Sequence, residues 1–167
     1  FCKGVGVYGS DAKHLGFSGY ICELLIMKYG SFENVLVATA HWKIPHIVSF
    51  GGAQNTFPHP LIIIDPTDDS RNAASNLSGE NFLRFIGAAS QFMKKPNEVF
   101  FFKQEAKPLV AKEIKMLQGR GTIFLAIAME KPKLIDDVLY PQLRKTLDRI
   151  ETFFSQNDFV VVRSGEF

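Results

Sequence analysis

The stretch IIIDPTDDSRNAASNLS, residues 62–78, joins an apolar β-branched run to an abrupt polar break. The run predicts a buried strand over 60–64 that stops at Asp65-Pro66. A short helix is predicted over 71–77, which places Arg71 in its first turn. A cation at that end of the helix dipole is unfavourable by ~0.3–1 kcal/mol, so the position of Arg71 needs an explanation.

Arginine chemistry supplies one explanation. A guanidinium is a planar fork that suits a phosphate or a base edge, and a helix N-terminus favours an anion. Arg71 is therefore a candidate nucleotide ligand, and the alternative is a local ion pair with Asp68 or Asp69. Ser18 and Gly19, at the start of another predicted helix, form a weaker candidate of the same kind, against the alternative of a plain helix cap.

A metal site is a further possibility in this stretch. The carboxylates of Asp65, Asp68 and Asp69 could bind Mg²⁺, but a solvated turn explains them equally. His41 and His46 lie close in sequence, yet no cysteine or carboxylate completes a zinc set around them. We therefore predict no metal ligand in this chain.

Helices are predicted upstream of the opening stretch. In GFSGYICELLIMKYG, residues 16–30, Ser18 is a good N-cap and Gly30 can end the helix in a left-handed conformation. Helical spacing puts Tyr20, Leu24 and Met27 in the core stripe of this helix, with Ile21 and Leu25 as further candidates. Ser31 then caps a second helix over about 32–42.

A strand pair and a longer helix complete the first half. HIVSF (46–50) and PLIII (60–64) are separated by a loop rich in glycine and proline, which favours a small antiparallel hairpin. Ser78 caps a helix over about 79–95, whose phenylalanines recur at helical spacing. EVFFFKQEAKP, residues 98–108, then indicates a linker or an edge strand, and we place a domain boundary near residue 100.

The second half has a different pattern. A helix is predicted over 108–118, with Pro108 at its first position, where no N–H is required. TIFLAIAME (122–130) and FVVVR (159–163) are predicted strands on either side of a helix over 137–156. This β-α-β order predicts an α+β fold, with a mainly helical domain over 1–100 and an incomplete α/β domain over 101–167.

Composition narrows the class of protein. The 167 residues are 46% hydrophobic and 22% charged, a composition typical of a folded domain. The net charge of +2 is too small to indicate a class of binding partner. Two cysteines do not make a disulfide scaffold, so a reducing, cytoplasmic location is expected. No signal peptide or membrane span is apparent. The first residue is not methionine, and both ends look cut, so we interpret the chain as a fragment of a longer protein.

Known catalytic motifs are missing from the sequence. There is no nucleophile elbow and no phosphate-binding Walker loop. Gly-Ser pairs occur at 9–10 and 30–31, but no acid-x-acid pair follows them to hold two Mg²⁺ ions. Basic residues instead cluster on two predicted helices, where they could contact RNA phosphates or simply be solvated; the candidates are Lys112, Lys115, Arg144, Lys145 and Arg149.

Taken together, three motifs resemble the archaeal (class I) CCA-adding enzymes, which are tRNA nucleotidyltransferases. They are VGVYGSDAK with GFSGYICELLIMKYGSF, then IIIDPTDDSRNAASNLSGENFLRF, and then DDVLYPQLRKTLDRIETFF with DFVVVRSGEF. The resemblance covers nearly the whole chain in the same order. It implies that the chain is the neck and most of the body of such an enzyme, without its catalytic head and its tail.

The resemblance also implies an activity and roles for residues. Such an enzyme adds C, C and A to the tRNA 3′ end from CTP and ATP, using Mg²⁺ held by the head domain. The neck is similar to the substrate-binding domain of poly(A) polymerases and oligoadenylate synthetases, and the body to a ferredoxin-like or RRM-like unit. Arg71 and Asn72 occupy the family's D-P-x-D-x-x-R-N motif, whose arginine helps to read the incoming base, so both are candidate nucleotide-binding residues. Arg144 and Lys145 would lie near the tRNA acceptor stem.

Two alternatives remain open from the sequence. The chain could be a piece of a poly(A) polymerase or of a 2′–5′ oligoadenylate synthetase, or it could be a free-standing RNA-binding module. The product separates the first alternative from a CCA-adding enzyme: a tRNA-specific CCA end against a long A tail or 2′–5′ oligomers. No membrane partner is expected.

Overall fold

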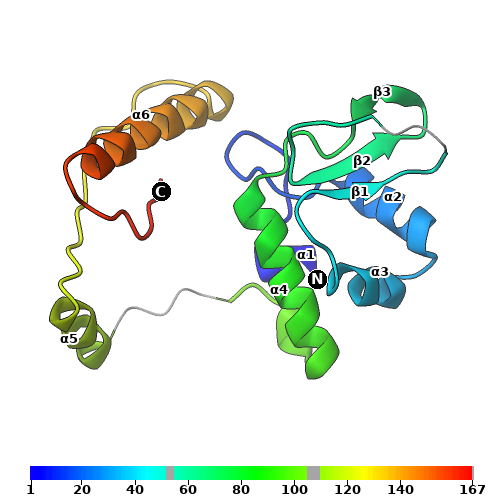
Figure 1. Ribbon diagram of the computed structural model, residues 1–167, viewed down its shortest axis with the longest axis horizontal. Coiled ribbons are helices and arrows are strands. Elements are labelled where there is room, and N and C mark those ends of the chain that lie inside the picture. Colours follow the sequence, from blue (N-terminus) through cyan, green and yellow to red (C-terminus); the bar gives the residue numbers. More distant parts are fainter. Residues whose placement is uncertain (52–54, 105–109, 167) are drawn as a thin grey trace.

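The computed structural model describes residues 1–51, 55–104 and 110–166. Helices surround a small sheet in the first half, and the second half consists of helices joined by extended chain (Figure 1). Its elements are α1 (Cys2–Val5), α2 (Gly19–Tyr29), α3 (Phe32–Thr39), β1 (His46–Val48), β2 (Leu61–Asp65), β3 (Asp68–Asn72), α4 (Gly79–Lys94), the 3-10 helix η1 (Glu98–Phe101), α5 (Ala111–Gly119) and α6 (Asp136–Gln156). This mixture of helix and strand is compatible with the predicted α+β class.

Local capping signals define the helices of the first half. Ser18 Oγ accepts a hydrogen bond from the backbone N–H of Ile21 at 3.1 Å, and Gly30 ends α2 with a φ of 83°. Ser31 caps α3 through the N–H of Asn34 at 3.2 Å. These contacts satisfy backbone donors that have no partner inside the helix. They confirm the predicted starts of both helices.

The core lies between α2, α3, α4 and the sheet. Fully buried side chains in this core include Leu24, Leu36, Leu61 and Phe82 from these elements, and Phe17 from the segment before α2. The face of α2 follows the prediction in part, because Leu24 and the further candidates Ile21 and Leu25 are buried, while Tyr20 and Met27 are exposed. The end of α3 also differs, since this helix stops at residue 39 and the chain then turns so that Trp42 is buried in the core.

The sheet corrects two predictions. Its strand order is β1-β2-β3, and β1 pairs with β2 in parallel rather than as an antiparallel hairpin. The connection over residues 49–60 is long enough for the crossover that parallel strands require. The helix predicted over 71–77 is also wrong, because residues 68–72 form β3, which turns back antiparallel to β2 around Pro66-Thr67.

The long helix α4 follows the prediction closely. Ser78 Oγ accepts from the N–H of Asn81 at 3.2 Å, and the helix then runs to residue 94. Phe82, Phe85 and Ala89 are buried on its inner face. After it, the predicted linker or edge strand is the short 3-10 helix η1, which packs against α1.

The predicted strands of the second half do not form. Residues 110–166 contain α5 and α6, and within the described residues neither 122–130 nor 159–163 is a strand. A strand needs a partner for its backbone N–H and C=O groups, and the described residues provide none beside these segments. The predicted start of a helix at Pro108 lies outside the described residues.

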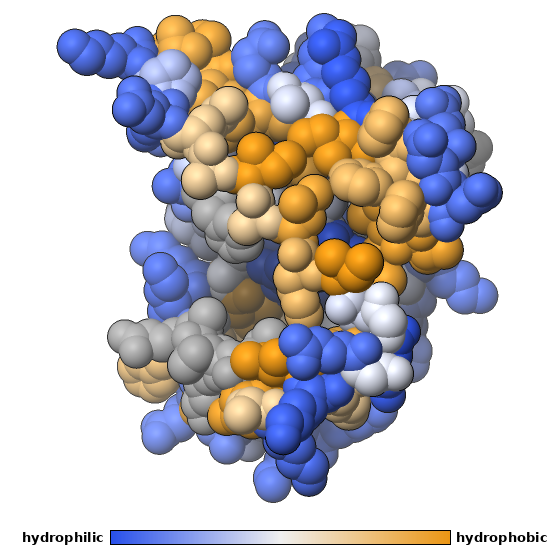
Figure 2. Space-filling view, turned by 90° about the vertical axis from the view of Figure 1, so that its left-hand side faces the viewer, coloured by the Kyte–Doolittle hydropathy of each residue, from blue (hydrophilic) through white to orange (hydrophobic). Residues whose placement is uncertain are grey.

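Apolar side chains of these segments are exposed instead. Ile123, Val160 and Val162 are at least four-fifths exposed, and Figure 2 shows apolar residues gathered on the face that carries the second half. Among the described residues, we find no helix with the length and apolarity that a membrane crossing requires.

Candidate functional site

Arg71 lies in β3, not at a helix N-terminus. Its Nη1 is 3.5 Å from Oδ2 of Asp65, and its side chain is 64% exposed. The predicted conflict with a helix dipole therefore does not exist. The alternative partners, Asp68 and Asp69, are also not the ones that Arg71 pairs with, because the ion pair is made with the buried aspartate at the end of β2.

Asp65 is a buried polar residue held by several partners. It is 1% exposed, and its Oδ1 accepts hydrogen bonds from the hydroxyl of Tyr20 at 2.9 Å, from the Thr67 N–H at 3.0 Å and from Thr67 Oγ1 at 2.7 Å. These donors, the two from Thr67 first, together with the Arg71 charge, hold the pKa of Asp65 below its usual value against the opposing effect of burial. The carboxylate is therefore ionised at neutral pH.

Tyr20 brings the start of α2 to this carboxylate. It follows Ser18 and Gly19 in sequence, so both halves of the predicted nucleotide site lie next to each other in the fold. The hydroxyl of Ser18 is used as the helix cap. Sequence reasoning missed Tyr20, which it had assigned to the core; the phenol hydroxyl, which needs a partner when half-buried, was the available signal.

Asn72 occupies a different position from its neighbour in the motif. It is 4% exposed, and its Oδ1 accepts from the N–H groups of Ile63 and Ala74, both at 2.9 Å, while its Nδ2 donates to the carbonyl of Leu61 at 3.1 Å. The amide is therefore used by the backbone of the sheet. Any effect of Asn72 on nucleotide binding has to act through the position of β3.

The aspartates of this turn do not fit a Mg²⁺ ion. Asp65 already has Tyr20, Thr67 and Arg71 as partners, and Asp68 Oδ1 accepts from the N–H of Ser70 at 3.0 Å and from its hydroxyl at 2.6 Å. No cluster of three or more histidine, cysteine or acidic side chains suited to a metal occurs in residues 1–51, 55–104 and 110–166. Asp65 and Asp68 therefore use their carboxylates for contacts within the protein.

Arg144 connects α6 to the first half of the molecule. Its guanidinium donates to the carbonyls of Ala12 and Lys13, its Nε forms an ion pair with Glu166 at 2.7 Å, and it lies over the ring of Tyr140. These contacts occupy the guanidinium on several sides. In this conformation Arg144 holds α6 in place, and a tRNA phosphate would have to compete with protein carbonyls for it.

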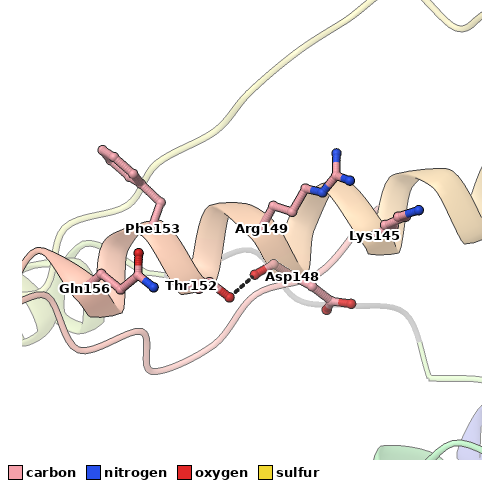
Figure 3. A pocket seen from close by; sticks show the side chains of 6 residues that line it. All are labelled: Lys145, Asp148, Arg149, Thr152, Phe153 and Gln156. Atoms are coloured by element: carbon pink, nitrogen blue, oxygen red, sulfur yellow. Dashed lines mark hydrogen bonds between the residues drawn. The ribbon is translucent and has the colours of Figure 1, made fainter.

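The other basic candidates are open to solvent. Lys145 and Arg149 line a shallow hollow on the outer face of α6, together with Asp148, Thr152, Phe153 and Gln156 (Figure 3). Phe153, beside them, is 62% exposed. Lys112 and Lys115 are exposed on α5, which Figure 1 shows apart from α6. The structure thus brings together one basic pair with an aromatic ring, and leaves the lysines of α5 elsewhere.

Comparison with known proteins covers both halves of the chain. Residues 1–102 match the family model described as tRNA nucleotidyltransferase, second domain, and residues 120–167 match the model described as CCA-adding enzyme, C-terminal domain. CCA-adding enzymes of Methanosarcina mazei and Methanocaldococcus jannaschii are 41% and 38% identical over 167 and 179 residues, which is 99% and 100% of this chain. That of Halorubrum lacusprofundi is 39% identical over 168 residues, or 98% of the chain. The chain spans only 36–39% of the length of these relatives.

Proposed function

The chain belongs to the tRNA nucleotidyltransferase family, with the archaeal CCA-adding enzymes as its relatives, and from this membership we propose that it works as the neck and body of a CCA-adding enzyme. The enzyme would add CCA to tRNA 3′ ends from CTP and ATP in the cytoplasm. The neck would correspond to residues 1–100 and the body to 101–167. No observation favours a poly(A) polymerase, an oligoadenylate synthetase or a free-standing RNA-binding module.

The observation that carries this proposal is the exposed guanidinium of Arg71 beside a buried, ionised carboxylate. An ion pair with one carboxylate oxygen leaves most of the five N–H donors of an arginine free. Those donors suit the acceptors of a nucleotide base edge or of a phosphate. Ser18 and Gly19, at the N-terminus of α2, would form the neighbouring part of the same wall, close to the free N–H groups of the helix.

The basic hollow of α6 would contact the tRNA. Lys145 and Arg149 supply positive charge, and the ring of Phe153 supplies a surface on which a base can stack. In Figure 3, Arg149 and Phe153 extend from the same side of the helix. Lys112 and Lys115 could extend the contact to phosphates further along the RNA, and Arg144 would join this surface only by leaving its carbonyl partners.

Nucleotidyl transfer itself would not be carried out by these residues. Two-metal chemistry requires paired carboxylates that face the reacting phosphate, and the described residues present no such pair. We therefore propose that Mg²⁺ is held by another domain of the enzyme. This chain would bind and orient the nucleotide and the tRNA end.

An incorporation assay tests this division of labour. The purified chain, given labelled ATP, Mg²⁺ and a tRNA ending in CC, should incorporate no AMP. The CCA-adding enzyme that carries this segment should incorporate it. Arg71→Ala in that enzyme should cost ~2–4 kcal/mol of transition-state stabilisation, measured as a fall in kcat/KM, as expected for a lost charged contact. Incorporation by the chain alone would contradict the proposal, as would unchanged kinetics of a folded Arg71→Ala variant.

A salt titration tests the contact with tRNA. The chain should bind a labelled minihelix of the acceptor and TψC arms more tightly than a DNA duplex of equal length, and the affinity should fall steeply with salt. Lys145→Ala should reduce the slope of log K against log salt by ~1 if this lysine contacts one phosphate. Equal binding of RNA and DNA would show that the specific contacts with tRNA are made by residues outside this chain.

A further inference from the structure

Several donors converge on one oxygen of a buried carboxylate at the end of β2. Tyr20 and Thr67 together direct three hydrogen bonds to Oδ1 of Asp65. Oδ2 is also buried, yet it has no hydrogen-bond partner in the described part of the chain. A buried carboxylate oxygen without a hydrogen bond is unfavourable unless a positive charge lies nearby.

Arg71 supplies that charge. The distance of 3.5 Å between its Nη1 and Asp65 Oδ2 is longer than a charge-assisted hydrogen bond, which is about 2.7–2.9 Å. The contact is therefore an ion pair, and the donors of the guanidinium remain available. One end of the group faces a fixed negative charge, while the rest of the side chain is open to solvent.

The backbone around this pair is also specialised. The pairing of β2 with β3 shifts register between Ile64 and Asp65, immediately before the turn that leads to Arg71. An irregularity of this kind re-aims the side chains beside it. Tyr20 reaches the same carboxylate from α2, 45 positions earlier in the chain, so the pair is tied both to the turn and to a separate helix.

We propose that Asp65 is a positioning residue that aims Arg71 at the incoming nucleoside triphosphate, and that Tyr20 and Thr67 hold Asp65 in the orientation this requires. The inference rests on the nucleotide-binding role proposed above for Arg71. A long arginine side chain loses rotamer freedom when it binds a ligand, and the loss is smaller when the group is already held in place. Asp65 would therefore improve nucleotide binding without touching the nucleotide.

A double-mutant cycle in the CCA-adding enzyme that carries this segment tests the proposal. KM and kcat are measured for CTP with a tRNA that lacks CCA, and for ATP with a tRNA ending in CC. Asp65→Asn keeps the shape and the Oδ1 acceptor but removes the negative charge that faces Arg71. Tyr20→Phe removes a single donor from Asp65, and Asp69→Asn is the control, because it removes an exposed carboxylate of the same turn.

The expected changes in KM and kcat distinguish a positioning role of Asp65 from a purely structural one. Asp65→Asn should raise KM about ten-fold and Tyr20→Phe roughly three-fold, the sizes expected for a weakened charged contact and a lost neutral hydrogen bond. Neither should lower kcat comparably, and Asp69→Asn should change neither constant. The double variant Asp65→Asn/Arg71→Ala should be no worse than Arg71→Ala alone, because Asp65 acts only through the arginine.

Two outcomes would overturn the inference, and they are distinguishable. If the losses of Asp65→Asn and Arg71→Ala add, Asp65 has an independent structural role, and only the positioning role fails. If Arg71→Ala leaves KM and kcat unchanged, the proposed role of Arg71 fails and the inference fails with it. Fluorescence of Trp42, which is buried in the core, checks folding. If Asp65→Asn does not fold, the cycle is run with Tyr20→Phe under the same criterion.

Discussion

Replacing Asn72 by alanine should destabilise the first half of the chain strongly. Asn72 lies next to Arg71 and was a candidate nucleotide ligand, but its side chain makes three hydrogen bonds to the backbone: to Ile63, Ala74 and Leu61. Ile63 and Leu61 belong to β2, the central strand of the sheet. The substitution removes the side-chain partner of all three backbone groups at once.

The magnitude follows from those contacts. A typical hydrogen bond contributes about 0.5–1.5 kcal/mol, and a buried group left without a partner costs about 1–3 kcal/mol. Three such groups predict a loss of about 3–5 kcal/mol in the free energy of unfolding, after partial relaxation of the site. A small domain has about 5–15 kcal/mol in total, so much of the stability would be lost.

Urea denaturation of the chain measures this loss. Trp42 is the single tryptophan of the sequence and is 8% exposed, so its fluorescence reports on the core directly. The matched control is Asn76→Ala, since Asn76 is exposed and makes one long bond of 3.4 Å to the carbonyl of Ser10; its effect should stay within about 0.5 kcal/mol. A loss below about 1 kcal/mol for Asn72→Ala, with an unchanged m-value, would refute the assignment of Asn72 to the sheet backbone.

Two further predictions concern stability. Burial holds the pKa of His46 below its usual value of about 6.5. The unfolded state therefore binds the proton more readily than the folded state. The stability contributed by neutral His46 should be complete above pH ~6.5 and should be lost as the pH falls towards the lower pKa of the folded state. The urea midpoint of the chain should show this fall, and His46→Gln should reduce it while His41→Gln, at an exposed position, should not. Phe82→Ala should lower the free energy of unfolding by about 3–5 kcal/mol, because Phe82 is 0% exposed. Leu83→Ala should lower it far less, because Leu83 is 55% exposed. Similar losses for the two variants would contradict the observed buried face of α4.

The helices show what sequence alone could predict. Ser18, Ser31 and Ser78 each accept a hydrogen bond from the N–H three positions later. Both partners of such a contact lie in one short stretch, so the signal can be read without knowledge of the fold. The family resemblance was also legible, because it rests on long motifs in a fixed order.

The strands show where local reasoning failed. DDSRN, residues 68–72, has no apolar alternation and little β-propensity, so it was predicted as part of a turn and a helix. It forms β3 because the turn at Pro66-Thr67 brings it back along β2, where Asn72 can satisfy the neighbouring backbone. The apolar segments 122–130 and 159–163 show the opposite case, since strong β-propensity did not make strands without a partner.

In the candidate site, too, some features could be predicted from the sequence and others required the tertiary structure. The sequence by itself determined that the chain resembles a tRNA nucleotidyltransferase, where its first helices begin, and that Arg71 is a residue to examine. Only the tertiary structure decided that Arg71 faces Asp65, that Tyr20 supports this carboxylate from α2, and that Arg144 is engaged by protein carbonyls. The physical reason is distance along the chain: a cap is made within one helical turn, whereas an ion pair to a buried carboxylate, and the contacts that support it, exist only after helix, turn and strand have packed together.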